Sequence, residues 1–441
     1  MKALKCQSTM INRPKKGISG TGCFIFSSAK LILLLVVILS FSSCSKPESR
    51  WLRGNMHTHT FWSDGDDFPE PVARWYKDKG YDFLVHTDHN LILEGERWRT
   101  FPADNPTLLK YIEEYGKDWA ETKPGEEDEE KVQVRLKTLE EFRSLYEEPG
   151  KFLLMMGNEI SNPHAVHLLA FEQDRVIPAV QGSVDERESM IRETVDRVAG
   201  YRSQTGINTW PVLAHPNFMW AITAEMMLGI PDLRFFEVYN GHPQVNNDGD
   251  EFRANTERIW DIVLANRLAA GGKLLYGLAT DDTHNYHREG ASPGKGWVMV
   301  RSDLITTEAV LNALDRGDFY ASTGVRLKKL AFNGKRLKVT IDPTEGAEYL
   351  IEFIGTMKGF DKQSQPAVDA DGNEIENTTR IYTSEIGTVL KESRGLSATY
   401  KFTGDELYVR ARITSTADQV DPNSGRIAGK EKAWIQPHTA Q

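Results

Sequence analysis

Two clusters of histidine and acidic residues lie close together in the chain. His57 and His59 are separated by one residue, and Asp64 follows them. Neighbouring side chains of an extended strand point to opposite faces, so these two imidazoles share one side. A lone His-x-His pair is more often a pair of structural histidines. However, a second cluster, HTDH at 86–89, directly follows the apolar run 81–85. Two such clusters favour a metal site with nitrogen and oxygen ligands.

The motifs HTHTFWSDG at 57–65 and TDHN at 87–90 together resemble the PHP family, named for its polymerase and histidinol phosphatase members. That family consists of metal-dependent phosphoesterases on a distorted seven-stranded β/α barrel. The resemblance covers residues 51–324. It implies an α/β fold of the PHP type, a distorted (β/α)7 barrel, and we expect a small all-β sandwich-like domain to follow it.

Further acidic and histidine residues come directly after short apolar runs, before a polar turn. Catalytic groups of a β/α barrel occupy this position, at the carboxyl ends of its parallel strands. Glu159 and His167 match the family pattern, with His164 as a nearby rival that is more often a surface residue. Asp282 and His284 match its last motif, whereas Asp281 is expected to hydrogen-bond within the turn. The runs and the residues beside them are 152–156 before Glu159, 168–171 after His167, 211–214 before His215, and 274–279 before Asp282.

The resemblance implies a set of metal ligands and their grouping. Nine ligands suit two or three divalent ions, and zinc, manganese and iron all accept nitrogen and oxygen ligands. Glu159, Asp282 and His215 are the residues expected to be catalytic. The predicted groups are His57, His59, Glu159 and Asp282 for one ion, Glu159, His167 and His215 for the second, and Asp64, His89 and His284 for the third.

Such a site would hydrolyse a phosphate ester, with a metal-bridging hydroxide as the nucleophile and the other ions holding phosphate oxygens. The substrate would be a small-molecule or polymer phosphate ester. Two alternatives stay open: metal-dependent hydrolysis of a non-phosphate bond, and a surface-anchored binding module. His86 departs from the family pattern, which has an apolar residue there. Further candidate contacts to phosphate or the leaving group are His86, Asp88, His242, His287, Arg288 and Lys295.

The first 44 residues resemble the signal peptide of a bacterial lipoprotein. Six basic residues precede the apolar run 31–41, which is short for a bilayer span and ends in Phe41-Ser42-Ser43-Cys44. We therefore expect a lipidated Cys44 that anchors the protein in the cell envelope, on the periplasmic face or in the outer membrane. An uncleaved N-terminal anchor is the alternative.

Composition limits the remaining possibilities. All 3 cysteines lie within residues 1–44, so the body has neither a disulfide nor a thiolate ligand. Without the leader, 47 basic residues remain against 63 acidic ones, which argues against non-specific binding to nucleic acid.

We expect a metal-dependent hydrolase domain over 45–325, with a helical insertion at about 91–150. Short alternating strands with turn residues over 326–441 predict the sandwich, to which we assign a packing or docking role.

Overall fold

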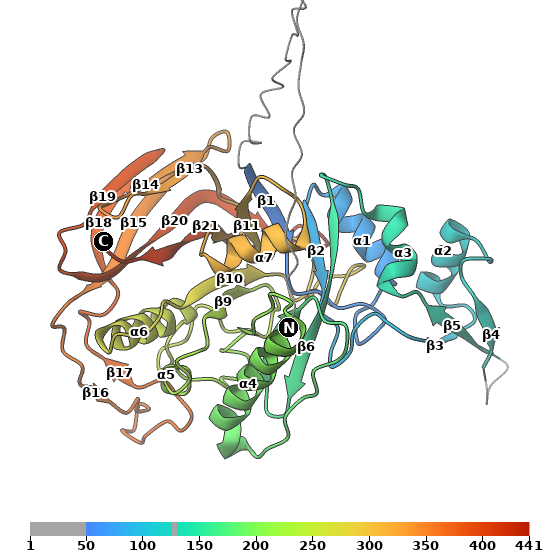
Figure 1. Ribbon diagram of the computed structural model, residues 1–441, viewed down its shortest axis with the longest axis horizontal. Helices are drawn as coiled ribbons and strands as arrows, with labels where there is room; N and C mark the ends of the chain where they lie inside the picture. The colour runs from blue at the N-terminus through green and yellow to red at the C-terminus, as the bar shows by residue number, and fades with distance from the viewer. Residues whose placement is uncertain (1–49, 126–129, 441) are drawn as a thin grey trace, which may run out of the picture. The chain divides into compact units, whose positions relative to one another are not determined.

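The computed structural model describes residues 50–125 and 130–440, and these belong to one compact unit, Lys46–Gln441. The predicted leader and its Cys44 lie outside the described residues. Within the described ranges, no helix is both long and apolar enough to cross a membrane. Figure 1 shows helices packed beside a long mixed sheet, which has the strand order β10-β9-β8-β7-β6-β2-β1-β11-β12-β21-β20-β15-β18.

The first half of this sheet carries the predicted ligands. Parallel ladders join β1 to β2, β2 to β6, β8 to β9 and β9 to β10, whereas β7 runs antiparallel to both β6 and β8. Continuous apolar sequences such as LLMM in β6 suit strands that are covered on both faces. The strands are β1 (Arg50–Asn55), β2 (Phe83–His86), β6 (Leu153–Asn162), β7 (Val166–Phe171), β8 (Val212–Leu213), β9 (Phe235–Asn240) and β10 (Tyr276–Thr280).

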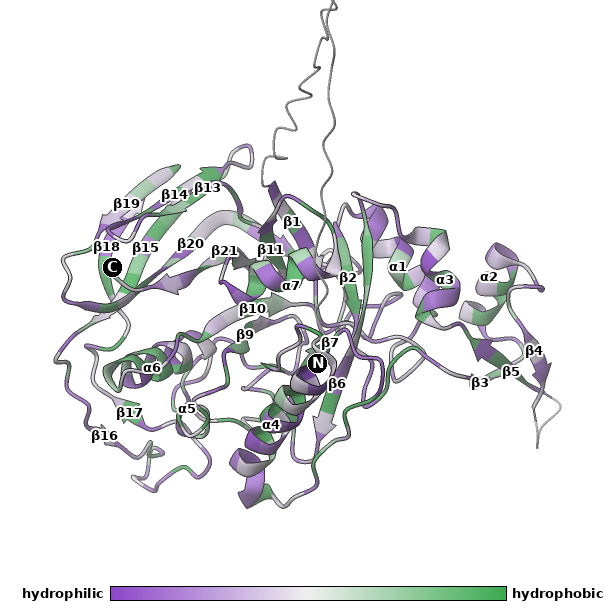
Figure 2. Ribbon diagram, viewed as in Figure 1, coloured by the Kyte–Doolittle hydropathy of each residue, from purple (hydrophilic) through white to green (hydrophobic). Residues whose placement is uncertain are grey.

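Helices connect and cover these strands. On α4, the apolar residues Met190, Ile191 and Val195 are buried, while Arg192 and Glu193 are exposed, and Figure 2 shows this mixture of apolar and polar residues. The helices are α1 (Pro69–Asp78), α4 (Arg187–Thr205) after the short η1 (Val184–Glu186), α5 (Ala224–Leu228), α6 (Thr256–Ala269) and α7 (Thr307–Asp315).

The expected mixed α/β class is confirmed, but a closed seven-stranded barrel is not detected in the described residues. The outer edge of β1 pairs antiparallel with β11 (Trp297–Ser302), which continues to β12 (Phe319–Ser322), so it is not free to form a ladder with β10. Beyond the strand ends, however, Thr58 and Thr283 form one parallel bridge. That bridge brings the segment after β10 against the segment after β1.

The insertion after β2 differs from the helical expectation. It contains α2 (Pro106–Tyr115) and α3 (Leu139–Tyr146), but also a three-stranded antiparallel sheet of β3 (Arg97–Pro102), β5 (Lys131–Leu136) and β4 (Thr122–Pro124). Val134 and Leu136, which fall within the insertion that we expect to be helical, lie in β5. Their alternation is that of a strand, and α3 begins only after Thr138, which forms a capping box with Glu141.

The C-terminal strands form two layers. Apolar side chains of β14 and β19, such as Val339 and Tyr400, belong to the same core cluster as Phe353 of β15. Because β21 pairs with β12, one layer continues the long sheet, and the boundary at 325/326 stays a prediction. The strands are β13 (Arg326–Phe332), β14 (Arg336–Asp342) and β19 (Ser397–Lys401) in one sheet, β15 (Tyr349–Met357), β18 (Thr388–Arg394), β20 (Glu406–Val420) and β21 (Ile427–His438) in the other, and β16 (Ser364–Gln365) with β17 (Ile381–Tyr382) as a separate pair.

Candidate metal centre

All nine predicted ligands converge at one end of the parallel strands. His57 and His59 follow β1, His89 follows β2, and His215 follows β8. His167 lies near the start of β7, and because β7 runs opposite to its neighbours, its start lies where β6 ends. Ligand atoms within 4.8 Å of one another form four groups: His57, Glu159 and His215; His57, His59 and Asp282; His89, Glu159 and His167; and His59, Asp64, His89 and His284.

Glu159 is the centre of this arrangement. Its carboxylate is buried, and its two oxygens face five imidazoles, so it is shared between the groups. The distances from Oε1 are 2.9 Å to His167 Nδ1, 3.1 Å to His215 Nε2 and 3.4 Å to His57 Nε2, and those from Oε2 are 2.7 Å to His89 Nδ1 and 3.4 Å to His59 Nε2.

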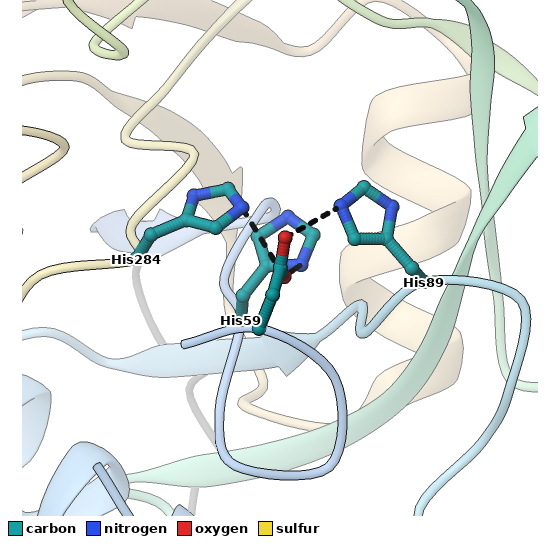
Figure 3. Close-up of side chains that lie close together, drawn as sticks. His59, His89 and His284 are labelled. Atoms are coloured by element: carbon teal, nitrogen blue, oxygen red, sulfur yellow. Dashed lines mark ion pairs between the residues drawn. The ribbon is translucent and has the colours of Figure 1, made fainter. Parts of the chain in front are cut away.

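A second carboxylate lies at the mouth of the site. Figure 3 shows the rings of His59, His89 and His284 turned towards it. Asp64 has a side chain that is 57% exposed, and its oxygens lie 3.4 Å from His284 Nε2, 3.5 Å from His89 Nε2 and 3.6 Å from His59 Nδ1. This group is therefore the one open to solvent, where a substrate can approach.

Several ligand atoms have no hydrogen-bond partner, although they are buried. They are Nε2 of His57, Nε2 of His59 and Nδ1 of His215. Buried polar atoms are almost always satisfied, so their convergence needs an explanation. Imidazole nitrogens and carboxylate oxygens that face a common centre are the donor set that zinc, manganese and iron accept. The residues present thus fit divalent ions.

The electrostatics of the cluster agree with that fit. Burial acts to lower the pKa of His57, but the carboxylates, Asp282 first, raise it well above 6.5. Burial and two neighbouring histidines lower the pKa of His59 to about 3. Burial acts to raise the pKa of Glu159, yet the surrounding histidines hold it well below 4.5. Glu159 is therefore ionised and His59 is neutral, which are the forms that bind a cation, whereas His57 must lose its proton before it can bind one.

Glu237 is a site residue that the sequence reasoning did not assign. It lies in the buried strand β9, and its Oε1 is 2.8 Å from Nδ1 of His57. Its Oε2 accepts the backbone N–H of His215 at 2.7 Å. A carboxylate behind a ligating imidazole fixes the ring orientation and raises its basicity. The signal was a charged residue within an otherwise apolar strand.

Two aspartates hold the loops that carry the ligands. Asp88 accepts hydrogen bonds from the backbone N–H and the hydroxyl of both Thr60 and Ser63, so it shapes the loop before Asp64. Asp281 accepts backbone N–H groups from 294–296, as expected for a residue that stabilises a turn. Asp88 is therefore fully occupied as a loop anchor.

Most other candidate contacts lie away from the cluster or are engaged elsewhere. His86 is buried against Phe142, and neither of its nitrogens has a partner. His164, the rival of His167, is exposed in the turn before β7 and belongs to none of the four groups. His242 does lie at the site, with its ring 5.5 Å from that of His284. The pairs formed by the other candidates are Lys295 with Asp421, His287 with Asp67, and Arg288 with Asp66.

Comparisons with solved structures give several remote likenesses. No family model matches the sequence, and no curated protein sequence is similar to it at a significant level. A two-domain protein from Bacteroides vulgatus, containing a predicted PHP-like metal-dependent phosphoesterase, is 13% identical, with a TM-score of 0.35 over 87% of this chain and 95% of the other. A chain from Bifidobacterium adolescentis, described as a candidate metal-dependent phosphoesterase, is 15% identical, with a TM-score of 0.28 over 60% of this chain and 96% of the other. Both structures are named for a metal-dependent phosphoesterase, one of them PHP-like, and the functional proposal rests on the side chains described above.

Proposed function

We propose that the protein is a PHP-like, metal-dependent phosphoesterase. The observation that carries this proposal is the position of Glu159, whose two carboxylate oxygens face five imidazoles at one strand end. A carboxylate shared in this way suits a site of two or three ions, because one group can neutralise two cations. The barrel type of the fold is part of the same proposal, and the Thr58–Thr283 bridge supports it.

The proposed ion assignments are those that the resemblance implies, and the four groups of ligand atoms match them in part. His57, His59, Glu159 and Asp282 would hold one ion, Glu159, His167 and His215 a second, and Asp64, His89 and His284 a third. The grouping of Asp64, His89 and His284 with His59 supports the third set. When bound, such ions supply Lewis acidity and lower the pKa of water into the neutral range.

The chain's own residues prepare the site for hydrolysis. Glu159 and Asp282 are buried and carry the negative charge that attracts and spaces the cations. His215 and Asp282 have positive φ angles of 27° and 51°, and such strained backbone persists where surrounding structure holds a functional side chain in place. Asp64 keeps the outer group open, so a phosphate can enter there. In the overall reaction, water forms a bond to phosphorus, the bond to the leaving oxygen breaks, and that oxygen takes up a proton.

The proposal is tested by measuring phosphate release from phenyl phosphate by the purified protein without its leader. We expect turnover that a chelator abolishes and added zinc, manganese or iron restores. Glu159→Gln should lose activity by at least about a thousandfold, because an amide cannot neutralise two cations. Glu193→Gln, a change on the exposed side of α4, is the matched control. Wild-type turnover in folded Glu159→Gln protein would contradict the assignment. Parallel assays with a phosphodiester and a carboxylate ester separate the enzymatic alternatives, and absence of turnover on all three would favour a binding module.

We also propose that the protein is anchored in the cell envelope through a lipid on Cys44. The basic segment, the apolar run and the small residues before Cys44 support this location. Cells that express Cys44→Ala should incorporate no labelled fatty acid into the protein. Labelling that persists in this variant would exclude Cys44 as the anchor.

A further inference from the structure

A pocket of about 380 Å³ lies apart from the metal ligands, and it is lined by segments that adjoin two of them in sequence. One wall is the turn with His164 and Ala165, which precedes His167 in β7. Another is Met219–Trp220, which follows His215 in the loop after β8. None of the nine candidate ligands lines this pocket, so it is a separate feature of the same end of the sheet.

Phe218 connects the two features. Its ring lies 5.2 Å from the ring of His215 and 6.5 Å from that of His167, so it forms part of the wall of the metal centre. The next two residues, Met219 and Trp220, line the pocket, and Met219 is 73% exposed. A substrate held at the metal centre therefore has an apolar surface beside it.

The backbone around this pocket is strained. His164, Ala165, Met219 and Trp220 have φ angles between 51° and 61°, and so does Asn377, with 52°. These five are more than half of the nine non-glycine residues with positive φ in the described ranges. Strain of this kind concentrates at binding and catalytic sites, where the fold must hold it in place.

The pocket contains two arginines with unused capacity. Arg187 is only 5% exposed, and its guanidinium donates to the backbone oxygens of Val184 and Ala221. Within 50–125 and 130–440, no carboxylate lies within ion-pair distance of it. Arg253 pairs with Asp250, but its buried Nε has no partner, and its guanidinium lies 4.9 Å from the centre of the Trp220 ring. A buried guanidinium without a carboxylate is well matched to an anionic ligand.

The C-terminal region supplies the remaining edge. Glu376 and Asn377 line the pocket, and the residues just after them are tied to α5. The Thr379 hydroxyl accepts the backbone N–H of Ala224 at 3.0 Å, and Glu225 accepts the backbone N–H of Arg380 at 3.2 Å. Glu376 is exposed and is the one acidic residue among those lining the pocket. Glu376 therefore lies at the solvent side of the pocket, and the positive charge of Arg187 lies at its buried side.

We propose that this pocket, the Arg187 pocket, binds the leaving group of the substrate and selects a leaving group that carries its own anionic group. The inference rests on the proposed phosphoesterase function and adds a substrate class: phosphate esters whose alcohol part is itself a carboxylate or phosphate. Met219 and Trp220 contact the carbon skeleton, while Arg187 and Arg253 bind the anion.

The test compares 4-carboxyphenyl phosphate with its methyl ester, which has the same ring but no charge on the leaving group. The ratio of the two kcat/KM values is measured for wild type, Arg187→Met and Arg253→Gln. We expect each variant to lower the ratio, Arg187→Met by about tenfold, the effect of removing one charge-assisted hydrogen bond. Comparing ratios cancels the different reactivities of the two esters. Arg192→Met, on the exposed side of α4, is the control and should keep the wild-type ratio.

A binding measurement separates this inference from the proposed function. Metal-free protein is mixed with 4-hydroxybenzoate or its methyl ester, and saturation-transfer NMR detects the bound form. We expect binding of the carboxylate, weakened in Arg253→Gln, which keeps the test valid if Arg187→Met does not fold. Metal-dependent phosphate release with an unchanged ratio in the folded variants would overturn the pocket but leave the function. Carboxylate binding that Arg253→Gln weakens, without turnover of any phosphate ester, would support the pocket but overturn the proposed phosphoesterase function.

Discussion

Glu237 stands directly behind His57, with Oε1 at 2.8 Å from Nδ1, so that Nε2 of the ring is left to face Glu159 and Asp282. The same carboxylate accepts the backbone N–H of His215 at 2.7 Å. One residue of β9 thus orients two candidate ligands that come from different strands.

We predict that Glu237→Gln weakens metal binding by about ten- to a hundredfold, the usual effect of losing a carboxylate behind a ligating histidine. The amide is close in size and can still accept one hydrogen bond, so the fold should survive. Titration against a chromogenic chelator measures the affinity. Glu225→Gln, on α5, is the control, and equal affinity in both variants would show that Glu237 has no part in metal binding.

Arg99 of β3 holds the loop that carries Asp64. Its Nη1 donates to the backbone oxygens of Phe61 and Ser63, each at 2.8 Å, and the guanidinium lies over the Phe61 ring. Since Asp64 follows Ser63 directly, the insertion contributes to the metal centre by fixing its most exposed ligand.

Arg99→Met should therefore release the loop and selectively weaken the ion at Asp64, His89 and His284. We expect about one equivalent less metal after dialysis against a weak chelator, with the inner ions retained. Arg97→Met changes an exposed arginine on the same strand and serves as the control. Full metal content in Arg99→Met, measured by elemental analysis, would assign the insertion to substrate binding or packing alone.

Glu70 predicts how stability changes with pH. Its carboxyl is fully buried on α1, and burial raises its pKa from 4.5 to about 7, although Tyr111 and Trp119 donate hydrogen bonds to it. The folded protein therefore holds this proton more tightly than the unfolded chain. Its contribution is fully present below pH 4.5 and is lost as the pH rises through 7, at a cost of about 3 kcal/mol.

Glu70→Gln should remove this pH dependence, because the amide stays neutral. We expect its Tm to exceed that of wild type by several degrees at pH 8, with a much smaller difference at pH 5, as measured by thermal unfolding. Glu113→Gln, at an exposed position of α2, should follow wild type at both values. A Tm difference that is the same at pH 5 and pH 8 would show that folding does not raise the pKa of Glu70.

The sequence predicted best what depends on local pattern. Glu159 and His215 could be found because each closely follows a short apolar run, although β6 continues past Glu159 to Asn162. Glu237 was missed because an acidic residue within β9 gives no periodic signal. The expectation of a helical insertion was wrong at Val134, because its neighbours alternate with a period of two, as strand residues do.

The pairing of strands that lie far apart in the chain could not be predicted. The pairing of β12 with β21 joins residues such as Tyr320 and Ile435, and nothing in either strand specifies the other. For the same reason, the expectation of an all-β region with a packing or docking role could not show that Glu376 and Asn377 line the Arg187 pocket. Strand identity is local, whereas the choice of partner depends on the whole fold.

The buried pair of Arg410 and Asp261 gives the last prediction, because it joins β20 to α6 across 149 residues of sequence. Arg410 is 1% exposed, and its Nε and Nη2 donate to the two carboxylate oxygens at 2.8 and 2.7 Å. The Tyr408 hydroxyl donates to the same carboxylate at 2.7 Å. Replacing Arg410 with methionine would leave that carboxylate buried without its cation.

We expect Arg410→Met to lower the free energy of unfolding by about 3–5 kcal/mol, as for a buried ion pair that loses one partner. Arg426→Met breaks an exposed pair with Glu289 and should cost less than about 1 kcal/mol. Denaturant unfolding measures both. Because no candidate ligand belongs to β20 or α6, the folded fraction of Arg410→Met should keep its full metal content. Loss of metal from that fraction would mean that the C-terminal strands hold the metal centre in shape, and not only α6.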